Sequence, residues 1–244
     1  MNRRFVEHDI RSVTDLGGFW DFAFLGDVDP DAVDPSTITY DDRMAVPGCF
    51  DATPDYAGRR GLAAYRTRIL FDDTTMHRLI LDGVHHWCRI LLDGEPVGDH
   101  VGGFTQFFAD LHPTVPGPAE LVILVDNRFD YDRCPLHLEY FDWYHFGGIA
   151  RGAALHRLGE LWIDRVQVVT TSIEPPEIRV MVRYGTMTPS EKVSLGMAVD
   201  DETVLSEEVT TAGNNGVIER ILSLPDADLW SPDEPNLHML HVHL

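Results

Sequence analysis

The sequence of 244 residues predicts an all-β protein made of two β-sandwiches, and three observations support this prediction. Short runs of alternating or continuously apolar residues recur at regular spacing, as in strands. Turns containing Gly or Pro separate these runs. No amphipathic helix of useful length lies between them. Many short strands with regular turns are typical of sandwich architectures.

The first domain is expected over residues 1–159. It opens with Phe19–Phe24, where aromatic side chains alternate with small or polar ones. Asp93-Gly94 is a strong two-residue hairpin signal, and Asp27–Ser36 is expected to form an acidic surface loop. The further strands are expected over Thr37–Val46, Tyr65–Phe71, Arg78–Asp82, Trp87–Leu92, Glu95–Val101, Phe104–Phe108 and Glu120–Val125. This order favours a jelly roll, in which two sheets pack face to face.

The second domain is expected over residues 160–244. Its strands are expected over Trp162–Thr171, Ile178–Tyr184, Val193–Val199, Thr203–Val209 and Val217–Leu222, with a last strand from Leu237 onward. About six short strands in one domain are typical of an immunoglobulin-like sandwich.

Composition limits the classes of partner. The formal net charge is −21 and the pI is near 4.7, which argues against nucleic acid or an anionic membrane as a partner, because either would require a basic surface. The hydrophobic fraction of 44% is sufficient for a core. No signal peptide and no apolar run of about 18 residues is found, so a cytoplasmic protein without a membrane segment is expected.

The sequence gives no reason to expect a cofactor or a metal. Cys49, Cys88 and Cys134 are too few and too scattered for a disulfide framework or a zinc site. His85 and His86 are expected between two strands. Adjacent residues of a strand point to opposite faces, so they would not bind a metal together, and we expect packing or turn contacts from them. His241 and His243 share a face if they lie on a strand, but two imidazoles without a third ligand make a poor zinc site.

The most informative stretch is 140–151, where five aromatic residues and Asp142 occupy seven positions before Gly147-Gly148. Aromatic faces cover the apolar face of a sugar, and a carboxylate accepts hydrogen bonds from its hydroxyls. Asp142 and the adjacent Trp143 are therefore candidate sugar-binding residues. The alternative is the end of a core strand followed by a glycine turn. The other four tryptophans are expected in the core.

Several further motifs occur in a set order along the chain. They are Leu16-Gly-Gly-Phe-Trp-Asp-Phe, Val46-Pro-Gly-Cys-Phe, Tyr65-Arg-Thr-Arg, Leu81-Asp-Gly-Val-His-His-Trp, Leu92-Asp-Gly-Glu-Pro-Val-Gly-Asp-His-Val-Gly-Gly-Phe-Thr and Val125-Asp-Asn-Arg. In this order they resemble the N-terminal sugar-binding domain of family 2 glycoside hydrolases, the β-galactosidases and β-glucuronidases, with the β-glucuronidase branch nearest. Leu229-Trp-Ser-Pro-Asp-Glu-Pro-Asn-Leu resembles the end of that family's next domain, an immunoglobulin-like sandwich.

The resemblance implies a role for Asp142, because the family has an Asp here that hydrogen-bonds a hydroxyl of the bound sugar. His145 stands where the glucuronidase branch commonly has asparagine, and it completes the set of predicted substrate-binding residues. Both catalytic glutamates of the family lie on a (β/α)₈ barrel, which needs about 250 residues of alternating strands and helices. Nothing in this sequence matches that pattern, so no catalytic residue is assigned.

The function expected from the resemblance is that of the non-catalytic N-terminal portion of a retaining glycosidase that acts on β-glucuronides or β-galactosides. The first domain would form one wall of the sugar pocket. The implied partners are the glycoside substrate, a catalytic barrel domain and a second copy in a homo-oligomer. A free-standing carbohydrate-binding or assembly module without hydrolase activity is the alternative. A purely structural interaction module is a third possibility.

Overall fold

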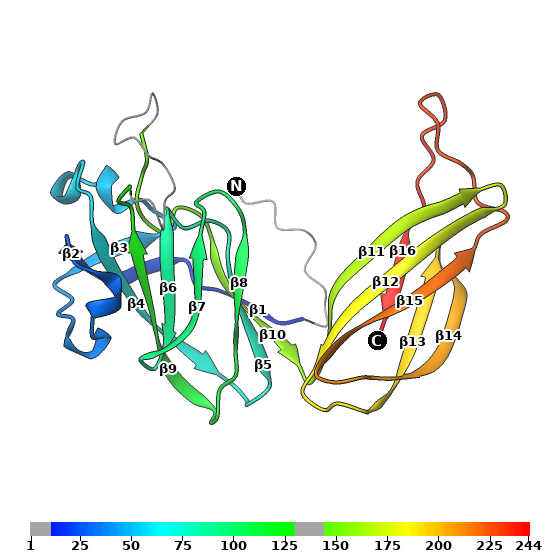
Figure 1. Cartoon of the computed structure of the whole chain (residues 1–244), viewed down its shortest axis with the longest axis horizontal. Helices are drawn as coiled ribbons and strands as arrows, with labels where there is room; N and C mark the ends of the chain where they lie inside the picture. Colours follow the sequence, from blue (N-terminus) through cyan, green and yellow to red (C-terminus); the bar gives the residue numbers. More distant parts are fainter. Residues whose placement is uncertain (1–10, 130–143) are drawn as a thin grey trace. The chain divides into compact units, whose positions relative to one another are not determined.

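The computed structural model describes residues 11–129 and 144–244. The chain divides into two compact units, Met1–Leu158 and Gly159–Leu244 (Figure 1). Regular structure in the described residues consists of strands and four short 3₁₀ turns. The prediction of an all-β fold made of sandwiches is therefore confirmed. No helix among the described residues is long and apolar enough to cross a membrane.

The strands of the first unit form two sheets. The strands are β1 (Val13–Asp15), β2 (Gly18–Gly26), β3 (Asp42–Val46), β4 (Leu62–Phe71), β5 (Met76–Leu81), β6 (Trp87–Leu92), β7 (Glu95–Val101), β8 (Phe107–Leu111), β9 (Gly117–Asp126) and β10 (Ala153–Gly159). One sheet has the order β3-β2-β4-β9-β6-β7 and the other has the order β1-β10-β5-β8. Apolar side chains from both sheets, including Phe22, Tyr65, Leu79 and Leu155, form one continuous core.

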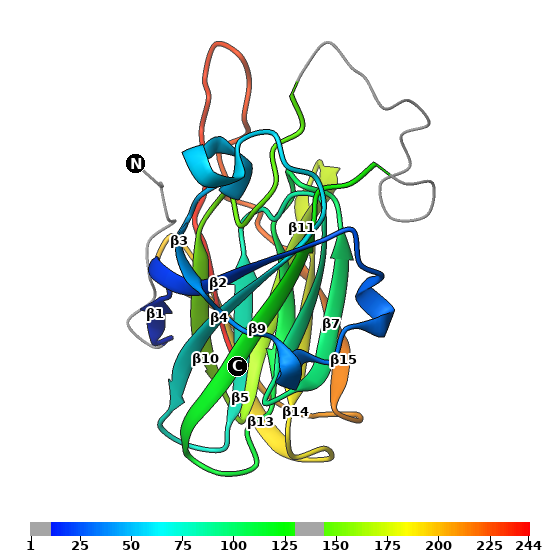
Figure 2. The same ribbon diagram turned by 90° about the vertical axis from the view of Figure 1, so that its left-hand side faces the viewer.

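The central strand β9 explains why part of the sequence is apolar without alternation. Its residues Leu121–Asp126 are all buried. Their inner face contributes to the core between the sheets. Their outer face packs, in a second cluster, against Val33, Ile38 and Tyr40 from the loop after β2. That loop contains the 3₁₀ turns η1 (Pro30–Ala32) and η2 (Pro35–Thr37), which Figure 2 shows in blue. The expected acidic surface loop therefore also covers a sheet face.

The Asp93-Gly94 hairpin signal corresponds to the turn between β6 and β7. Asp93 has a φ of 49° and Gly94 a φ of 86°, as a two-residue hairpin turn with both central residues in the left-handed region requires. The two strands pair antiparallel from Leu92↔Glu95 to Trp87↔Val101, with a register shift after Ile90.

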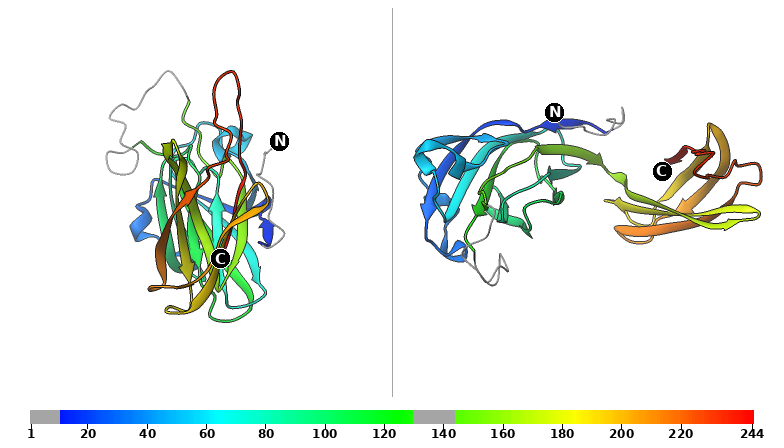
Figure 3. Two further views of the ribbon diagram at one scale, coloured as in Figure 1. Left: turned by 90° about the vertical axis from the view of Figure 1, so that its right-hand side faces the viewer. Right: turned by 90° about the horizontal axis from the view of Figure 1, so that it is seen from above.

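The second unit also has two sheets facing each other (Figure 3). Its strands are β11 (Leu161–Ile173), β12 (Pro176–Thr186), β13 (Lys192–Val199), β14 (Glu202–Thr210), β15 (Asn215–Ser223) and β16 (Leu240–His243). The sheet orders are β11-β12-β15 and β14-β13-β16. The core includes Val182, Tyr184, Leu195 and Met197. The Tyr184 hydroxyl accepts a hydrogen bond of 2.7 Å from the Ala212 N–H.

Two tryptophans expected in the core, Trp162 and Trp230, lie outside it, and Trp162 is half-buried apart from the core cluster of the second unit. Trp20 and Trp87 are buried as expected, but Trp230 is 60% exposed. It lies on the long loop between β15 and β16, whose residues are mostly exposed. His85 and His86 lie between β5 and β6, where His85 makes an isolated bridge to Gly148. The sequence also placed these two residues between two strands, and the expectation of packing or turn contacts from them is confirmed.

Candidate functional site

The segment Tyr144–Ile149 crosses one end of the first sandwich between two loops. On one side the Phe50 N–H donates to the Gly147 carbonyl at 2.9 Å. On the other side the His85 N–H donates to the Gly148 carbonyl at 2.9 Å. This segment therefore has backbone hydrogen-bond partners on both flanks, although it is not part of either sheet.

Both glycines of this segment are required by close approach. A Cβ on Gly147 would lie 2.5 Å from the Asn127 Nδ2 atom, and one on Gly148 would lie 2.5 Å from the Gly48 carbonyl oxygen. Gly148 also has a φ of +138°, which side chains disfavour. The contacts of both positions therefore require glycine because neighbouring groups approach the backbone closely.

Asp51 is a buried carboxylate that fixes this segment. It is 3% exposed and lies in the 3₁₀ turn η3 (Phe50–Ala52). The Gly147 N–H donates to its Oδ1 atom at 2.9 Å and the Asn127 Nδ2 donates to its Oδ2 atom at 3.2 Å. Burial, the nearby charge of Asp51 and a hydrogen bond to it raise the pKa of the Tyr144 hydroxyl. No ion pair to Asp51 is found among the described residues, so hydrogen-bond donors satisfy its buried oxygens.

Asn127 is fully buried and connects the end of β9 to the loop of residues 51–61. Its Oδ1 atom accepts from the Gly61 N–H at 2.9 Å. Its Nδ2 group donates to Asp51 and, at 3.1 Å, to the Arg59 carbonyl. Every polar atom of this amide therefore has a partner, as a buried polar network requires.

Arg60 links the chain on both sides of residues 130–143. Its guanidinium donates to the carbonyl of Asn127 at 3.2 Å and also to the carbonyl of His145. The same group lies 4.9 Å from the ring centroid of Phe129 and 5.0 Å from that of Tyr144. Two charge-assisted hydrogen bonds and two cation–π contacts thus hold these residues together.

His145 lies behind this network and is 5% exposed. Its ring centroid is 5.1 Å from that of His86 and 4.8 Å from that of Phe129. Burial, followed by the charges of His86, Arg60 and His85, lowers the pKa of His145 to about 4. The imidazole is therefore neutral at neutral pH. Its Nε2 atom has no hydrogen-bond partner among the described residues.

Aromatic side chains form an exposed rim beside the buried network. Tyr144 is 46% exposed, Phe146 39% and Phe104 65%. The rings of Tyr144 and Phe146 are 4.5 Å apart, and the Phe104 ring is 4.7 Å from that of His85. Exposed rings over a fixed polar framework are the kind of surface that covers the apolar face of a sugar.

The sequence-predicted site residues are only partly within the described structure. Asp142 and Trp143 lie outside the described residues. His145 lies within them, in the buried layer, and its binding role stays a prediction. Three residues of the framework were not identified from the sequence as site residues: Asp51, Arg60 and Asn127. Asn127 belongs to the Val125-Asp-Asn-Arg motif, which was the available signal.

The described residues contain no group of three or more His, Cys, Asp or Glu side chains that could hold a metal ion. Cys49 and Cys88 are free thiols, and burial, the largest effect, raises the pKa of each.

The fold and motifs place the chain among known proteins. No protein-family model matches it. A family 2 (GH2) β-galacturonidase from Eisenbergiella tayi, solved bound to galacturonate, superposes with a TM-score of 0.76 at 26% identity over 99% of this chain. In its fold and its ordered motifs the chain is therefore similar to the N-terminal β-sandwich region of family 2 glycoside hydrolases.

Individual relatives include a β-glucuronidase from Paenibacillus borealis, 27% identical over an alignment of 268 positions that covers 96% of this chain. A β-galactosidase from Thermoanaerobacterium thermosulfurigenes is 25% identical over 190 residues, or 73% of this chain. The chain spans 42% and 25% of the lengths of these two relatives, and 42% of the E. tayi protein. A Bifidobacterium dentium β-glucuronidase shares the fold, with a TM-score of 0.71 at 20% identity. The superposition covers 97% of this chain and 46% of the B. dentium chain.

Proposed function

We propose that the chain is the non-catalytic N-terminal part of a retaining glycosidase that acts on β-linked uronides, with β-galactosides as the second substrate class. The end of the first unit forms one wall of the sugar pocket, and a catalytic domain supplies the acid and the nucleophile. The observation that carries this proposal is the framework of Asp51, Asn127 and Arg60. It fixes the backbone of Tyr144–Gly148, the residues that directly follow Asp142 and Trp143 in the sequence.

The framework suits positioning and not proton transfer. A buried carboxylate that accepts bonds from a peptide N–H and an amide holds its neighbours in place. The rim of Tyr144, Phe146 and Phe104 offers apolar contact. Uronides are favoured as substrates because β-glucuronidases and a β-galacturonidase match the chain over nearly its whole length.

The test uses the complete protein encoded by the gene that contains this chain, together with the 244-residue chain alone. Both are assayed on 4-nitrophenyl β-glucuronide, β-galacturonide and β-galactoside. We expect turnover of a uronide by the complete protein only. Asp142→Ala should lower kcat/KM by about 10- to 100-fold, since a misplaced substrate loses productive orientation. Gln106→Ala, at an exposed amide, is the control and should leave kcat/KM unchanged.

Two results would contradict the proposal. One is turnover by the chain alone that Asp142→Ala abolishes. The other is a complete protein that hydrolyses none of the three substrates. If the 244-residue chain binds these sugars and the complete protein hydrolyses none of them, the free-standing carbohydrate-binding alternative is correct.

A further inference from the structure

The outward face of the β11-β12-β15 sheet in the second unit carries an arrangement that the sugar pocket does not use. On β12, Val182 and Tyr184 point into the core. The alternate residues Arg183 and Gly185 therefore lie on the outward face. Across to β11, Gly185 pairs with Trp162 and Arg183 pairs with Arg165. An indole and two guanidiniums thus share one end of this face.

Trp162 lies directly over Gly185. A Cβ on Gly185 would be 2.2 Å from the Trp162 Cζ2 atom and 2.3 Å from its Cε2 atom. The missing side chain therefore makes room for the indole to lie against the sheet. Trp162 is half-buried in this position and does not belong to the core cluster of the second unit. Its ring is held in place on the surface beside the two arginines.

Arg165 and Arg183 are directly opposite each other on neighbouring antiparallel strands, and both are exposed. Like charges in this position destabilise a sheet. In the described part of the chain no carboxylate pairs with either one. The nearest outward-facing acid along β15, Glu219, pairs with Arg179 at 3.8 Å. Asp164 is the extra residue of the β11 bulge beside Arg165.

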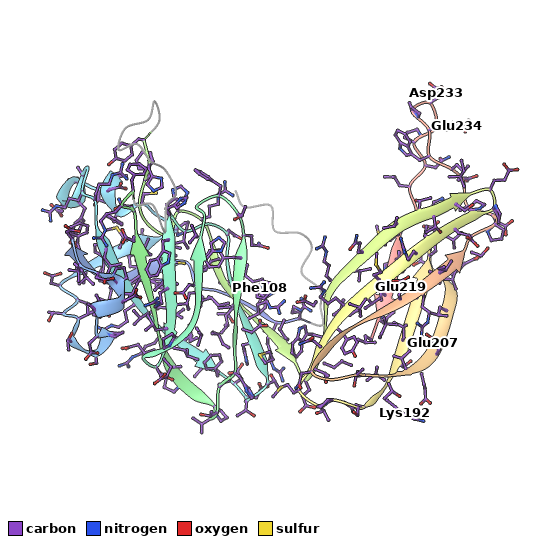
Figure 4. The ribbon with its side chains drawn as sticks, viewed as in Figure 1. Phe108, Lys192, Glu207, Glu219, Asp233 and Glu234 are labelled. Carbon is purple, nitrogen blue, oxygen red and sulfur yellow. The ribbon has the colours of Figure 1, made fainter. Side chains whose placement is uncertain are left out.

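This lack of partners is notable in so acidic a unit. Residues 159–244 contain five Lys or Arg side chains and fifteen Asp or Glu side chains. Carboxylates are abundant, yet two of the five basic side chains stand together without one. Figure 4 shows Glu219 on this unit, and also Lys192, a third basic residue, which pairs instead with Glu208 at 3.8 Å.

We infer that Trp162, Arg165 and Arg183 form a surface site for a carboxylated saccharide, such as a chain of uronate residues. The indole covers the C–H face of one sugar ring, and the planar guanidiniums bind its carboxylate or that of the next residue. The charge of the site selects an anion. A second copy docking through the same face is disfavoured, because two arginine pairs would meet. The ligand class, but not the site, rests on the proposed function.

The test is a titration of the 244-residue chain with a galacturonate trisaccharide at low ionic strength. Binding is measured by calorimetry and by tryptophan fluorescence. Maltotriose, a neutral trisaccharide, is the ligand control. We expect binding of the uronate only. Arg183→Gln and Arg165→Gln should each weaken it by about fivefold or more, the effect of an exposed ion pair with good geometry. Arg183→Lys should weaken binding by an intermediate factor, because lysine keeps the positive charge but lacks the planar pair of N–H donors that a guanidinium offers to a carboxylate.

The matched control is Lys192→Gln, which removes one positive charge from the opposite sheet and should change the affinity less than twofold. Thermal unfolding of every variant checks that the second unit remains folded. Equal weakening by Lys192→Gln and Arg183→Gln would reduce the effect to net charge and overturn the site. Absence of uronate binding at millimolar concentration would overturn it as well.

Two further measurements separate this inference from the proposed function. Binding that Asp142→Ala abolishes and Arg183→Gln leaves intact would assign the uronate to the pocket and overturn the surface site. Binding that depends on Arg183, in a complete protein that hydrolyses no uronide, would support the surface site while the proposed function fails. Sedimentation that shows self-association lost in Arg183→Gln would identify the face as a contact between copies and overturn the saccharide site.

Discussion

Replacing Asn127 by alanine should remove most of the stability of the end of the first unit. The side chain is fully buried and makes three hydrogen bonds, to the Gly61 N–H, Asp51 and the Arg59 carbonyl. Alanine would leave all three groups without this partner. A buried polar group without a partner costs about 1–3 kcal/mol. Because water can enter the space and satisfy part of the deficit, we expect Asn127→Ala to lower the free energy of unfolding by about 4 kcal/mol.

The assay is urea unfolding of the 244-residue chain, monitored by tryptophan fluorescence. Trp20 and Trp87 are both buried in the first unit, so their fluorescence should change when this unit unfolds. Gln106→Ala is the control in the same unit. Its exposed amide makes a single hydrogen bond of 2.7 Å to Asp82, so its loss should cost less than about 0.5 kcal/mol. A change of less than about 1 kcal/mol for Asn127→Ala would refute the assignment of this amide as the centre of the framework.

A second variant, Asn127→Asp, tests the electrostatic part of the reasoning. It keeps the acceptor for Gly61 but places a second carboxyl group about 3.2 Å from the Asp51 carboxylate. The two groups can be accommodated when they share a proton, so the introduced group is expected to bind that proton more tightly when folded than when unfolded. Stability is therefore retained at low pH and lost as the pH rises. We expect the variant to be clearly less stable at pH 8 than at pH 5, unlike the alanine variant.

Three further outcomes can be checked by the same unfolding measurement. Gly147→Ala should lower the free energy of unfolding by about 2 kcal/mol or more, because its Cβ would lie 2.5 Å from the buried Asn127 amide. Gly58→Ala, at a φ of +72° with no neighbour near the new Cβ, should lower it by only about 1 kcal/mol. The pKa of His145 is lowered to about 4, so the free energy of unfolding should fall by about 2–3 kcal/mol as the pH falls from about 6.5 to 4. His145→Asn should reduce this loss, and a variant with the same pH profile as the original protein would contradict the prediction. Tyr184→Phe should destabilise the second unit by about 1–2 kcal/mol, because the Ala212 N–H loses its acceptor. An unchanged free energy of unfolding would mean that this N–H bonds to water instead.

The sequence predicted most of the strands because their signals are local, but β1 and β10 were not predicted and β8 begins three residues later than expected. The hairpin at Asp93-Gly94 depends on two adjacent residues that adopt positive φ. The continuous apolar run of β9 reports burial on both faces. Trp230 was misassigned to the core because its apolar character does not reveal that the loop between β15 and β16 leaves it exposed.

The framework of the site was not predicted because its contacts join distant parts of the chain. Asp51 meets the Gly147 N–H across 96 positions, and Arg60 meets the His145 carbonyl across 85. Asp51 and Arg60 stand in a loop rich in charge, where no periodicity distinguishes a buried carboxylate from a solvated one. Asn127 was part of a recognised motif, but the motif alone gave no partner for it.

The pairing of β1 with β10 has a consequence for the order in which the first unit is completed during synthesis. The first and last strands of this unit are neighbours, with Val13 opposite His156. A chain that grows from its N-terminus cannot form this pairing until residue 156 is made. Until then the apolar residues of β5, which lie in the same sheet, lack the cover that β10 provides. Nascent chains that end before β10 should therefore be sensitive to proteases and bind chaperones, and protection should appear abruptly once β10 has left the ribosome.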